Sequence, residues 1–145
     1  MFKRILVPTD GSIISNRVIR DCMRFAKQIE ATIVGLIAIP PYAPYVNEAG
    51  VLVDSREQLD REWVSYANQC LDEIKVAAKD FGVKCETFHV IDNYPHAAII
   101  ETAQNRKCDL IAMASHGRKG VKGFLLGSET QKVLTHCQIP VLVFR

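Results

Sequence analysis

Short apolar segments alternate with longer helical patterns along this chain, and this alternation most restricts its fold. Five segments predict buried strands: 5–7, 31–39, 85–90, 109–114 and 141–144. A helical pattern lies between each pair. Strands that are apolar without alternation are typical of a parallel sheet covered on both faces. The order therefore predicts an α/β fold with an open, mostly parallel five-stranded sheet and helices on both faces, in a Rossmann-like arrangement.

Residues that typically begin or end helices and strands support this order of segments. Pro8 is expected to end the first strand, and Ser12 or Ser15 can cap the helix that follows. The longest helical pattern covers residues 54–81, and Gly82 follows where a C′ glycine would end a helix. One face of that helix is expected to be buried, and it carries Leu59, Trp63, Tyr66, Cys70, Ile74, Ala77 and Phe81. Pro95 suits the first turn of the third helix.

A glycine-bearing loop joins the fourth strand to the last helix. Residues 113–117 read Met-Ala-Ser-His-Gly, and Gly127-Ser128 follow after residues 118–126. Ser128 with Gln131 matches a capping box for the last helix. A strand, a glycine loop and a helix N-terminus in this order favour phosphate binding, because free N–H groups and the positive end of the helix dipole face the ligand. The chain is therefore expected to bind a nucleotide.

Three other features of the sequence point to the same place. In parallel α/β sheets a ligand lies at the carboxyl ends of the strands, where the strand order reverses. Asp10 follows the first strand, Ala38 lies at the end of the second, and residues 115–117 follow the fourth. We expect these positions to line one crevice if the first and fourth strands are neighbours.

Length and composition exclude several classes of protein. A chain of 145 residues fits one domain, over residues 1–145. A formal net charge of +2 is too small to indicate a nucleic acid or an anionic membrane as partner. The apolar runs are too short to span a bilayer, and no secretory signal is expected. The five cysteines form no CxxC pair, so we expect reduced thiols in a cytoplasmic protein and no zinc site.

Motifs of common nucleotide enzymes are missing. No GxxxxGK[ST] stretch indicates a P-loop, and no GxGxxG follows the first strand. The spacing of serine, cysteine, histidine and acidic residues indicates no catalytic triad and no pair of carboxylates with a general-acid role. The sequence therefore favours a binding protein over an efficient enzyme, with at most slow ATP hydrolysis.

Four parts of the chain together resemble the universal stress protein family, and the resemblance covers essentially the whole chain. They are residues 5–12, 36–40, 113–128 and 139–143. Residues 114–128 are similar to the family's nucleotide motif, a glycine, two residues, a glycine, nine residues and a glycine with serine or threonine. Two positions depart from the family: Ala114 replaces the first motif glycine, and Asn93 replaces a glycine common before the third helix. The Ala114 methyl group would crowd the ligand or, if the backbone stays extended, be harmless.

The resemblance implies binding of ATP with Mg²⁺, and it assigns roles to particular residues. Asp10 and the main chain at Ala38 would hold the adenosine, Gly117 would lie close to the ribose and phosphates, and Gly127 with Ser128 would receive phosphate oxygens. The full set expected around the nucleotide is Pro8, Thr9, Asp10, Ala38, Met113, Ala114, Ser115, His116, Gly117, Gly127, Ser128, Glu129 and Thr130. It also implies a homodimer that pairs through the last strand, Val141 to Phe144. An exposed apolar edge strand suits such pairing.

Several residues allow a second interpretation. Asp10 and Ser128 can cap their helices with or without a ligand. Basic side chains between residues 118 and 122 can offset phosphate charge or simply be solvated, and residues 40–53 can form a lid or an ordinary connection. His116 can contact phosphate or a divalent ion, whereas the other three histidines (His89, His96 and His136) are interpreted as structural or surface residues.

Two functions of different classes therefore remain open. The chain is an ATP-binding, dimeric stress-response or signalling switch, or it is a dimerising interaction module that holds no nucleotide. An adenylate-transferring enzyme of similar fold is a distant third reading, because fold alone does not determine function.

Overall fold

The computed structural model describes residues 1–41, 49, 56–116 and 126–145. These residues form five strands and four helices that alternate along the chain. The strands are β1 (Arg4–Thr9), β2 (Thr32–Ile39), β3 (Cys85–Ile91), β4 (Leu110–Ala114) and β5 (Val141–Phe144). The helices are α1 (Ile13–Gln28), α2 (Arg56–Phe81), α3 (Pro95–Asn105) and α4 (Ser128–His136). The predicted order of elements is confirmed.

The strands form one parallel sheet in the order β3-β2-β1-β4-β5. β1 therefore lies between β2 and β4, as the predicted crevice requires. Thr9 at the end of β1 pairs with Ile37 of β2, and Leu6 pairs with Ile111 of β4. The strand order reverses between β1 and β4, because the chain first adds β2 and β3 on one side and later β4 and β5 on the other.

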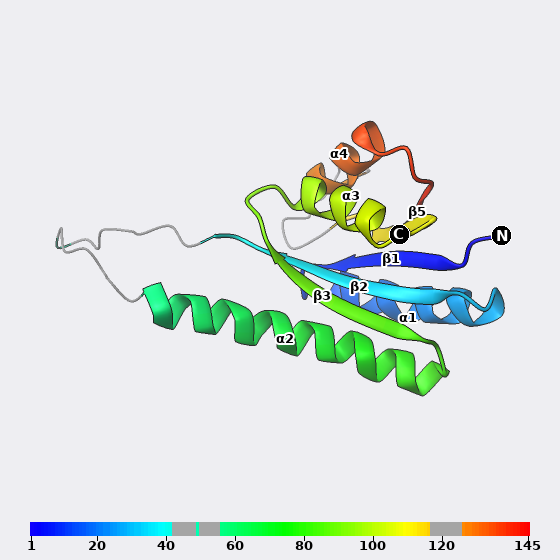
Figure 1. Cartoon of the computed structure of the whole chain (residues 1–145), viewed down its shortest axis with the longest axis horizontal. Helices are drawn as coiled ribbons and strands as arrows, with labels where there is room; N and C mark the ends of the chain where they lie inside the picture. Colours follow the sequence, from blue (N-terminus) through cyan, green and yellow to red (C-terminus); the bar gives the residue numbers. More distant parts are fainter. Residues whose placement is uncertain (42–48, 50–55, 117–125) are drawn as a thin grey trace.

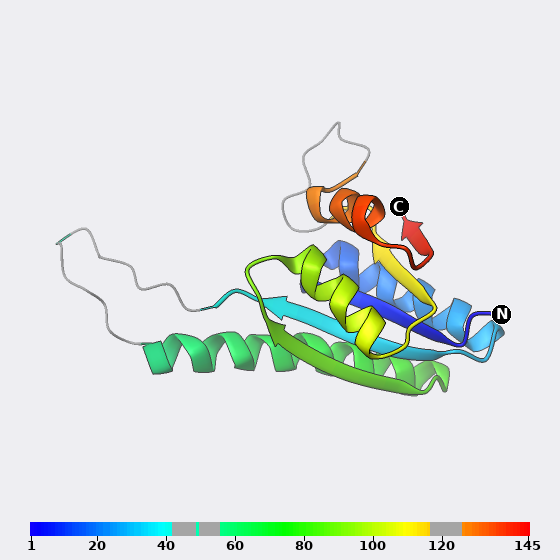
Figure 2. The ribbon, with the colours of Figure 1, turned by 45° about the horizontal axis from the view of Figure 1, so that its top comes forward.

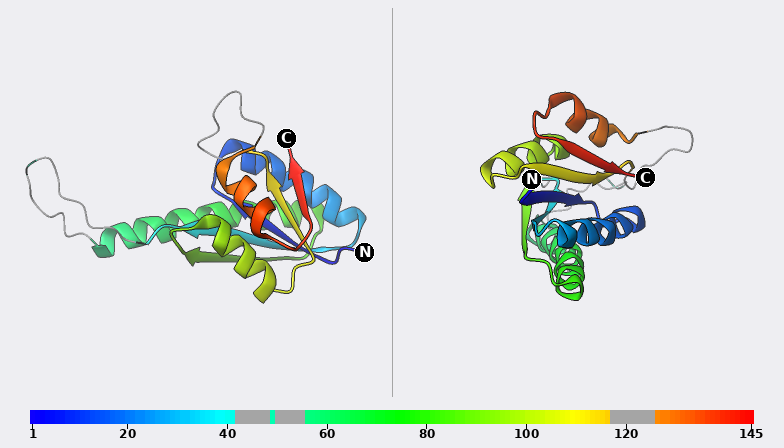
Figure 3. Two further views of the ribbon diagram at one scale, coloured as in Figure 1. Left: turned by 90° about the horizontal axis from the view of Figure 1, so that it is seen from above. Right: turned by 90° about the vertical axis from the view of Figure 1, so that its right-hand side faces the viewer.

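Two helices cover each face of the sheet. α1 and α2 lie on one face and α3 and α4 on the other (Figure 1 and Figure 3). Side chains of β1 alternate between the two layers: Ile5 and Val7 belong to the core under α1 and α2, and Leu6 to the core under α3 and α4. All three are fully buried, and each such side chain contributes about 1.5–3 kcal/mol through the hydrophobic effect.

Local signals placed most element boundaries correctly, but Pro8 does not end β1. Pro8 pairs with Leu36 inside the strand, which continues to Thr9. Proline lacks an N–H group, so it is tolerated where few ladder bonds are required. The pairing of β1 with β4 covers only Ile5 and Leu6, and Pro8 lies beyond it.

The predicted buried face of α2 is wrong at Trp63, which is 38% exposed. Successive residues of a helix point about 100° apart, so Trp63 and Val64 cannot both face the core. Val64 takes the inward position instead and packs against the core. Trp63 makes an edge-on contact with Tyr66, with ring centroids 6.3 Å apart.

The start of α4 also differs from the prediction. The N-cap is Gly127, with an extended backbone (φ −68°, ψ 154°), and none of the described side chains caps the helix. The N–H of Gln131 donates to the Gly127 carbonyl at 2.9 Å, so the helical bonds begin one residue before Ser128. The capping box that was expected from Ser128 and Gln131 is therefore not formed.

Among the described residues, no helix combines the length and the apolar character needed to cross a bilayer. The five cysteines are free thiols.

Candidate functional site

The ends of β1, β2 and β4 lie next to one another at the carboxyl edge of the sheet. Because Thr9 pairs with Ile37, the following residues Asp10 and Ala38 stand at the same level. Ser115 directly follows β4 on the other side of β1. The three positions that the sequence placed around one crevice are therefore brought to one edge of the sheet.

Asp10 caps the N-terminus of α1. Its Oδ1 accepts a hydrogen bond from the Ser12 N–H at 2.9 Å and another from the Ser15 hydroxyl at 2.8 Å. Ser12 is the N-cap residue, and its hydroxyl accepts from the Ser15 N–H at 3.2 Å. The capping interpretation of Asp10 is thus confirmed, and it fixes the carboxylate at the positive end of α1.

Tyr66 holds this turn, and no pattern in the sequence indicates it. Its hydroxyl, on α2, donates to the Asp10 carbonyl at 3.0 Å. The next residue, Gly11, has φ +75°, a left-handed conformation that other residues rarely adopt. A Cβ at Gly11 would collide with the Tyr66 hydroxyl and would lie 2.7 Å from Cys70 Sγ. Gly11 is therefore required both by its backbone angle and by the close approach of α2.

The connection from β4 to α4 is closed by three hydrogen bonds. The Ser115 N–H donates to the Phe144 carbonyl of β5 at 2.7 Å, and the Gly127 N–H donates to the Ser115 carbonyl at 2.6 Å. The buried Thr130 hydroxyl donates to the Ala114 carbonyl at 2.9 Å. Ala114, Ser115, Gly127 and Thr130 thus meet, although 11 residues separate Ser115 from Gly127.

These bonds change the expected role of Gly127. The resemblance assigned its N–H to phosphate, but that group donates to Ser115 within the protein. The N–H groups of Ser128, Glu129 and Thr130 precede the first helical bond, which Gln131 donates. The exposed Ser128 adds a hydroxyl to them. The first turn of α4, rather than Gly127 itself, is the part of this motif that can donate to an anion.

Glu129 faces α3 rather than the crevice. Its Oε2 accepts from the His96 N–H at 2.9 Å and lies 3.0 Å from His96 Nδ1, while Oε1 accepts from Lys132 at 2.8 Å. Burial raises the pKa of Glu129, but the hydrogen bonds from Lys132 and His96 outweigh burial and hold it below its ordinary value. The Glu129 side chain is therefore engaged with α3 and with its own helix, so the predicted contact of Glu129 with the nucleotide falls to its backbone N–H.

The remaining predicted residues fall into two groups. Pro8, Thr9 and Met113 lie in β1 and β4, and His116 follows Ser115, whose hydroxyl oxygen is 3.0 Å from His116 Nδ1. Gly117, the basic side chains of residues 118–122 and most of the proposed lid over residues 40–53 lie outside the described residues. His89 and His136 are exposed, and His96 is held by Glu129, in line with their structural or surface interpretation.

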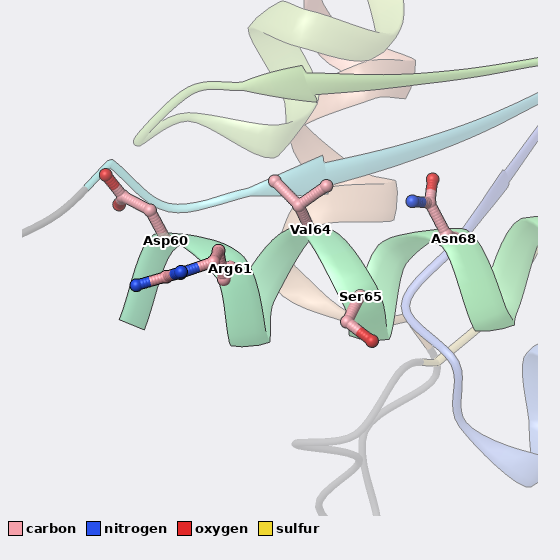
Figure 4. Close-up of a pocket in the computed structure, with 5 residues that line it drawn as sticks. All are labelled: Asp60, Arg61, Val64, Ser65 and Asn68. Carbon is pink, nitrogen blue, oxygen red and sulfur yellow. The ribbon is translucent and has the colours of Figure 1, made fainter. Parts of the chain in front are cut away.

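Two hollows of about 430 and 450 Å³ lie on α2, away from these residues. The first is lined by Asp60, Arg61, Val64, Ser65 and Asn68, with Val64 and Asn68 directed toward the sheet and Ser65 away from it (Figure 4). The second lies between α1 and α2. Neither contains a residue predicted to bind nucleotide. Within the part of the chain that the structure describes, no three metal-ligating side chains gather in one place.

Comparisons with known proteins agree on one family. The model of the universal stress protein family matches residues 1–145. Universal stress protein MJ0531 of Methanocaldococcus jannaschii is 30% identical over 146 residues, which cover 100% of this chain and 83% of that protein. The solved structure of protein MJ0577 from the same organism has a TM-score of 0.83 at 29% identity, over 99% of this chain and 95% of that one. A universal stress protein in complex with cAMP shares the fold, with a TM-score of 0.69 at 23% identity over 99% and 96% of the two chains.

Proposed function

This chain belongs to the universal stress protein family, and we propose that it binds an adenine nucleotide, ATP with Mg²⁺, at the carboxyl edge of its sheet. One observation carries the proposal: Asp10, Ala38 and the first turn of α4, which is bonded to the end of β4, all lie at the edge of the sheet where the strand order reverses. Ligands of open α/β sheets bind at this place. Solved proteins of the same fold hold cAMP, dAMP and AMP, which supports adenosine as the common part of the ligand.

The proposed contacts follow from the groups available at each strand end. The Asp10 carboxylate and the main chain at Ala38 hold the adenosine, as hydrogen-bond acceptors for its amino or hydroxyl groups. The N–H groups of the first turn of α4 and the Ser128 hydroxyl receive the phosphates. His116 follows Ser115 at the end of β4 and is proposed to lie beside the phosphates. The same role for Gly117 rests on the family resemblance alone, and Mg²⁺ is proposed to reach the protein bound to the phosphates.

Ala114 is compatible with this proposal. It is the last residue of β4, it pairs with Phe144, and it is 9% exposed. Its side chain belongs to the core under α1 and α2. An extended backbone was the condition under which the methyl group is harmless, and Ala114 meets it. The loss of the motif glycine therefore does not argue against a ligand.

In this proposal the protein is a binding protein that acts as a stress-response switch in the cytoplasm and forms a homodimer through β5. Among the described residues β5 is an edge strand, bonded to β4 on one side only, and each of its residues is partly exposed. Edge strands with free backbone groups pair readily with a second copy. Light scattering of the wild-type chain and of Val143→Lys should show a dimer and a monomer, respectively.

The test of nucleotide binding begins with the purified protein. Denaturation followed by chromatography identifies any nucleotide that it carries, and calorimetry of the emptied protein with ATP and Mg²⁺ gives the affinity. Released ATP, or a clear binding heat, supports the proposal. A folded chain that releases no nucleotide and gives no heat refutes it and favours the interaction module.

Asp10→Asn provides the matched variant. Asparagine keeps an oxygen that can accept from Ser12 and Ser15, so α1 stays capped. It removes the negative charge and one acceptor, so we expect affinity to fall by about tenfold while the unfolding midpoint changes little. Equal affinities of the two chains would exclude Asp10 as a ligand contact.

A further inference from the structure

A carboxylate in the first turn of α4 joins this helix to α3. Glu129 Oε2 accepts from the His96 N–H and lies 3.0 Å from His96 Nδ1, and Oε1 binds Lys132 at 2.8 Å. The side chains of His96 and Glu129 are 20% and 34% exposed, so solvent screens the pair only partly. Figure 2 shows α3 and α4 side by side over the same face of the sheet.

Glu129 supplies what the start of α3 lacks. The N-cap of α3 is Tyr94, which makes no side-chain cap bond, and Pro95 follows as the first helical residue. The His96 N–H lies in the first turn of α3, where backbone N–H groups have no partner within the helix. Glu129 accepts its hydrogen bond from 33 residues away in sequence. Together with the bond from Thr130 to the Ala114 carbonyl, this contact fixes the first turn of α4 against both α3 and β4.

The same contact sets the charge beside the proposed phosphate site. A carboxylate in the first turn offsets part of the positive helix end that attracts phosphate. Lys132 balances one negative charge, so the cluster of His96, Glu129 and Lys132 is neutral when His96 is neutral and positive when His96 is protonated. The other titratable groups that the described residues bring to His96 are the ring of His136 on α4, 6.2 Å away, and Tyr94, 6.3 Å away.

We propose that His96 and Glu129 are a positioning pair that sets how strongly the α4 end of the site attracts phosphate, and that protonation of His96 strengthens this attraction. The inference rests on the proposed nucleotide binding and concerns two side chains that face each other rather than the ligand. Histidine is the side chain whose ordinary charge change lies closest to neutral pH, so a change of pH tests the pair. The effect grows with the number of phosphates on the ligand, because the interaction is between charges.

The test is calorimetry of ATP with Mg²⁺, and of adenosine, at about pH 6 and about pH 8. The chains are wild type, His96→Asn, Glu129→Gln and the control His89→Gln, which changes an exposed histidine of β3. Asparagine at 96 keeps the backbone N–H and cannot be protonated. Comparison between chains removes the protonation of ATP itself, which is the same for all.

For each chain, the affinity for ATP at pH 6 is divided by the affinity at pH 8. We expect this ratio to be about two- to fivefold larger in wild type than in His96→Asn, which is the usual effect of one charge at a helix end. The control should behave as wild type, and adenosine should show no such difference. Glu129→Gln should raise ATP affinity at pH 8, because it removes a negative charge from the first turn of α4. A purely structural role would instead weaken ATP and adenosine alike.

The inference would be overturned if the affinity for ATP changed equally with pH in wild type and His96→Asn, or if Glu129→Gln bound ATP no more tightly than wild type at pH 8. Either result would leave nucleotide binding intact. Failure of the folded wild-type chain to bind any of the ligands would overturn the proposed function and this inference together.

Discussion

Replacement of Gly11 by alanine should destabilise the protein far more than the same replacement at Gly82. Both glycines have a left-handed backbone, with φ +75° and φ +69°. Alanine in this conformation costs about 1–2 kcal/mol at either site. At Gly82 no atom of the described residues lies within 4 Å of the added Cβ, so this cost stands alone.

At Gly11 the added Cβ meets the Tyr66 hydroxyl and lies 2.7 Å from Cys70 Sγ. Relief of this overlap requires α2 to shift, which costs about 1–3 kcal/mol. The bond from Tyr66 to the Asp10 carbonyl is lost in the process, at about 1 kcal/mol. The expected loss of unfolding free energy is therefore about 3–6 kcal/mol for Gly11→Ala, against about 1–2 kcal/mol for Gly82→Ala.

Urea unfolding followed by circular dichroism measures both values, provided that the slopes agree. The double variant Gly11→Ala, Tyr66→Phe tests the cause. Phenylalanine removes the oxygen that the Cβ meets, so the double variant should lose less stability than the sum of the two single variants. Equal losses for Gly11→Ala and Gly82→Ala, or strict additivity with Tyr66→Phe, would refute the proposed collision.

Four further outcomes follow from single side chains. Thr130→Val leaves the Ala114 carbonyl without its bond and should cost about 1–3 kcal/mol in urea unfolding, whereas Thr130→Ser should restore most of it. Ile74→Ala in the fully buried core should cost about 2–5 kcal/mol by the same measurement, and a value below about 1 kcal/mol would contradict its burial. Burial raises the pKa of Cys22 to about 12, so iodoacetamide should modify it in urea but hardly in the native state at pH 8. The pKa of Glu129 is lowered in the folded protein, so its contribution to stability is present above its ordinary value of 4.5 and is lost as pH falls through the folded value. In Glu129→Gln the unfolding midpoint should therefore fall less steeply as pH is lowered through this range. An equally steep fall in both chains would exclude this contribution.

Interactions that reach only a few residues along the chain were predictable from the sequence. Ser12 caps α1, and Gly82 follows α2 with a positive φ, because caps and stops depend on backbone groups close in sequence. Capping by Asp10 was foreseen as one of two interpretations for the same reason. The helix and strand order followed from periodic burial, which each segment carries by itself.

Contacts between distant segments could not be read in this way. Trp63 and Val64 both suit an apolar face, and only the rotation of α2 about its axis, which is set when α2 packs on the sheet, decides which one turns inward. The start of α4 at Gly127 depends on the bond from its N–H to Ser115, across a loop. A local pattern cannot foresee either, because both depend on contacts with a distant part of the chain.

The sequence by itself determined the parallel α/β class, the family and the edge of the sheet at which a ligand would lie, because apolar periodicity and glycine spacing are properties of the chain. Tertiary structure alone decided that Tyr66 of α2 holds the Asp10 turn and that Glu129 of α4 caps α3. Each of these bonds joins groups that are at least 33 residues apart, and such groups meet only after the helices have packed on the sheet.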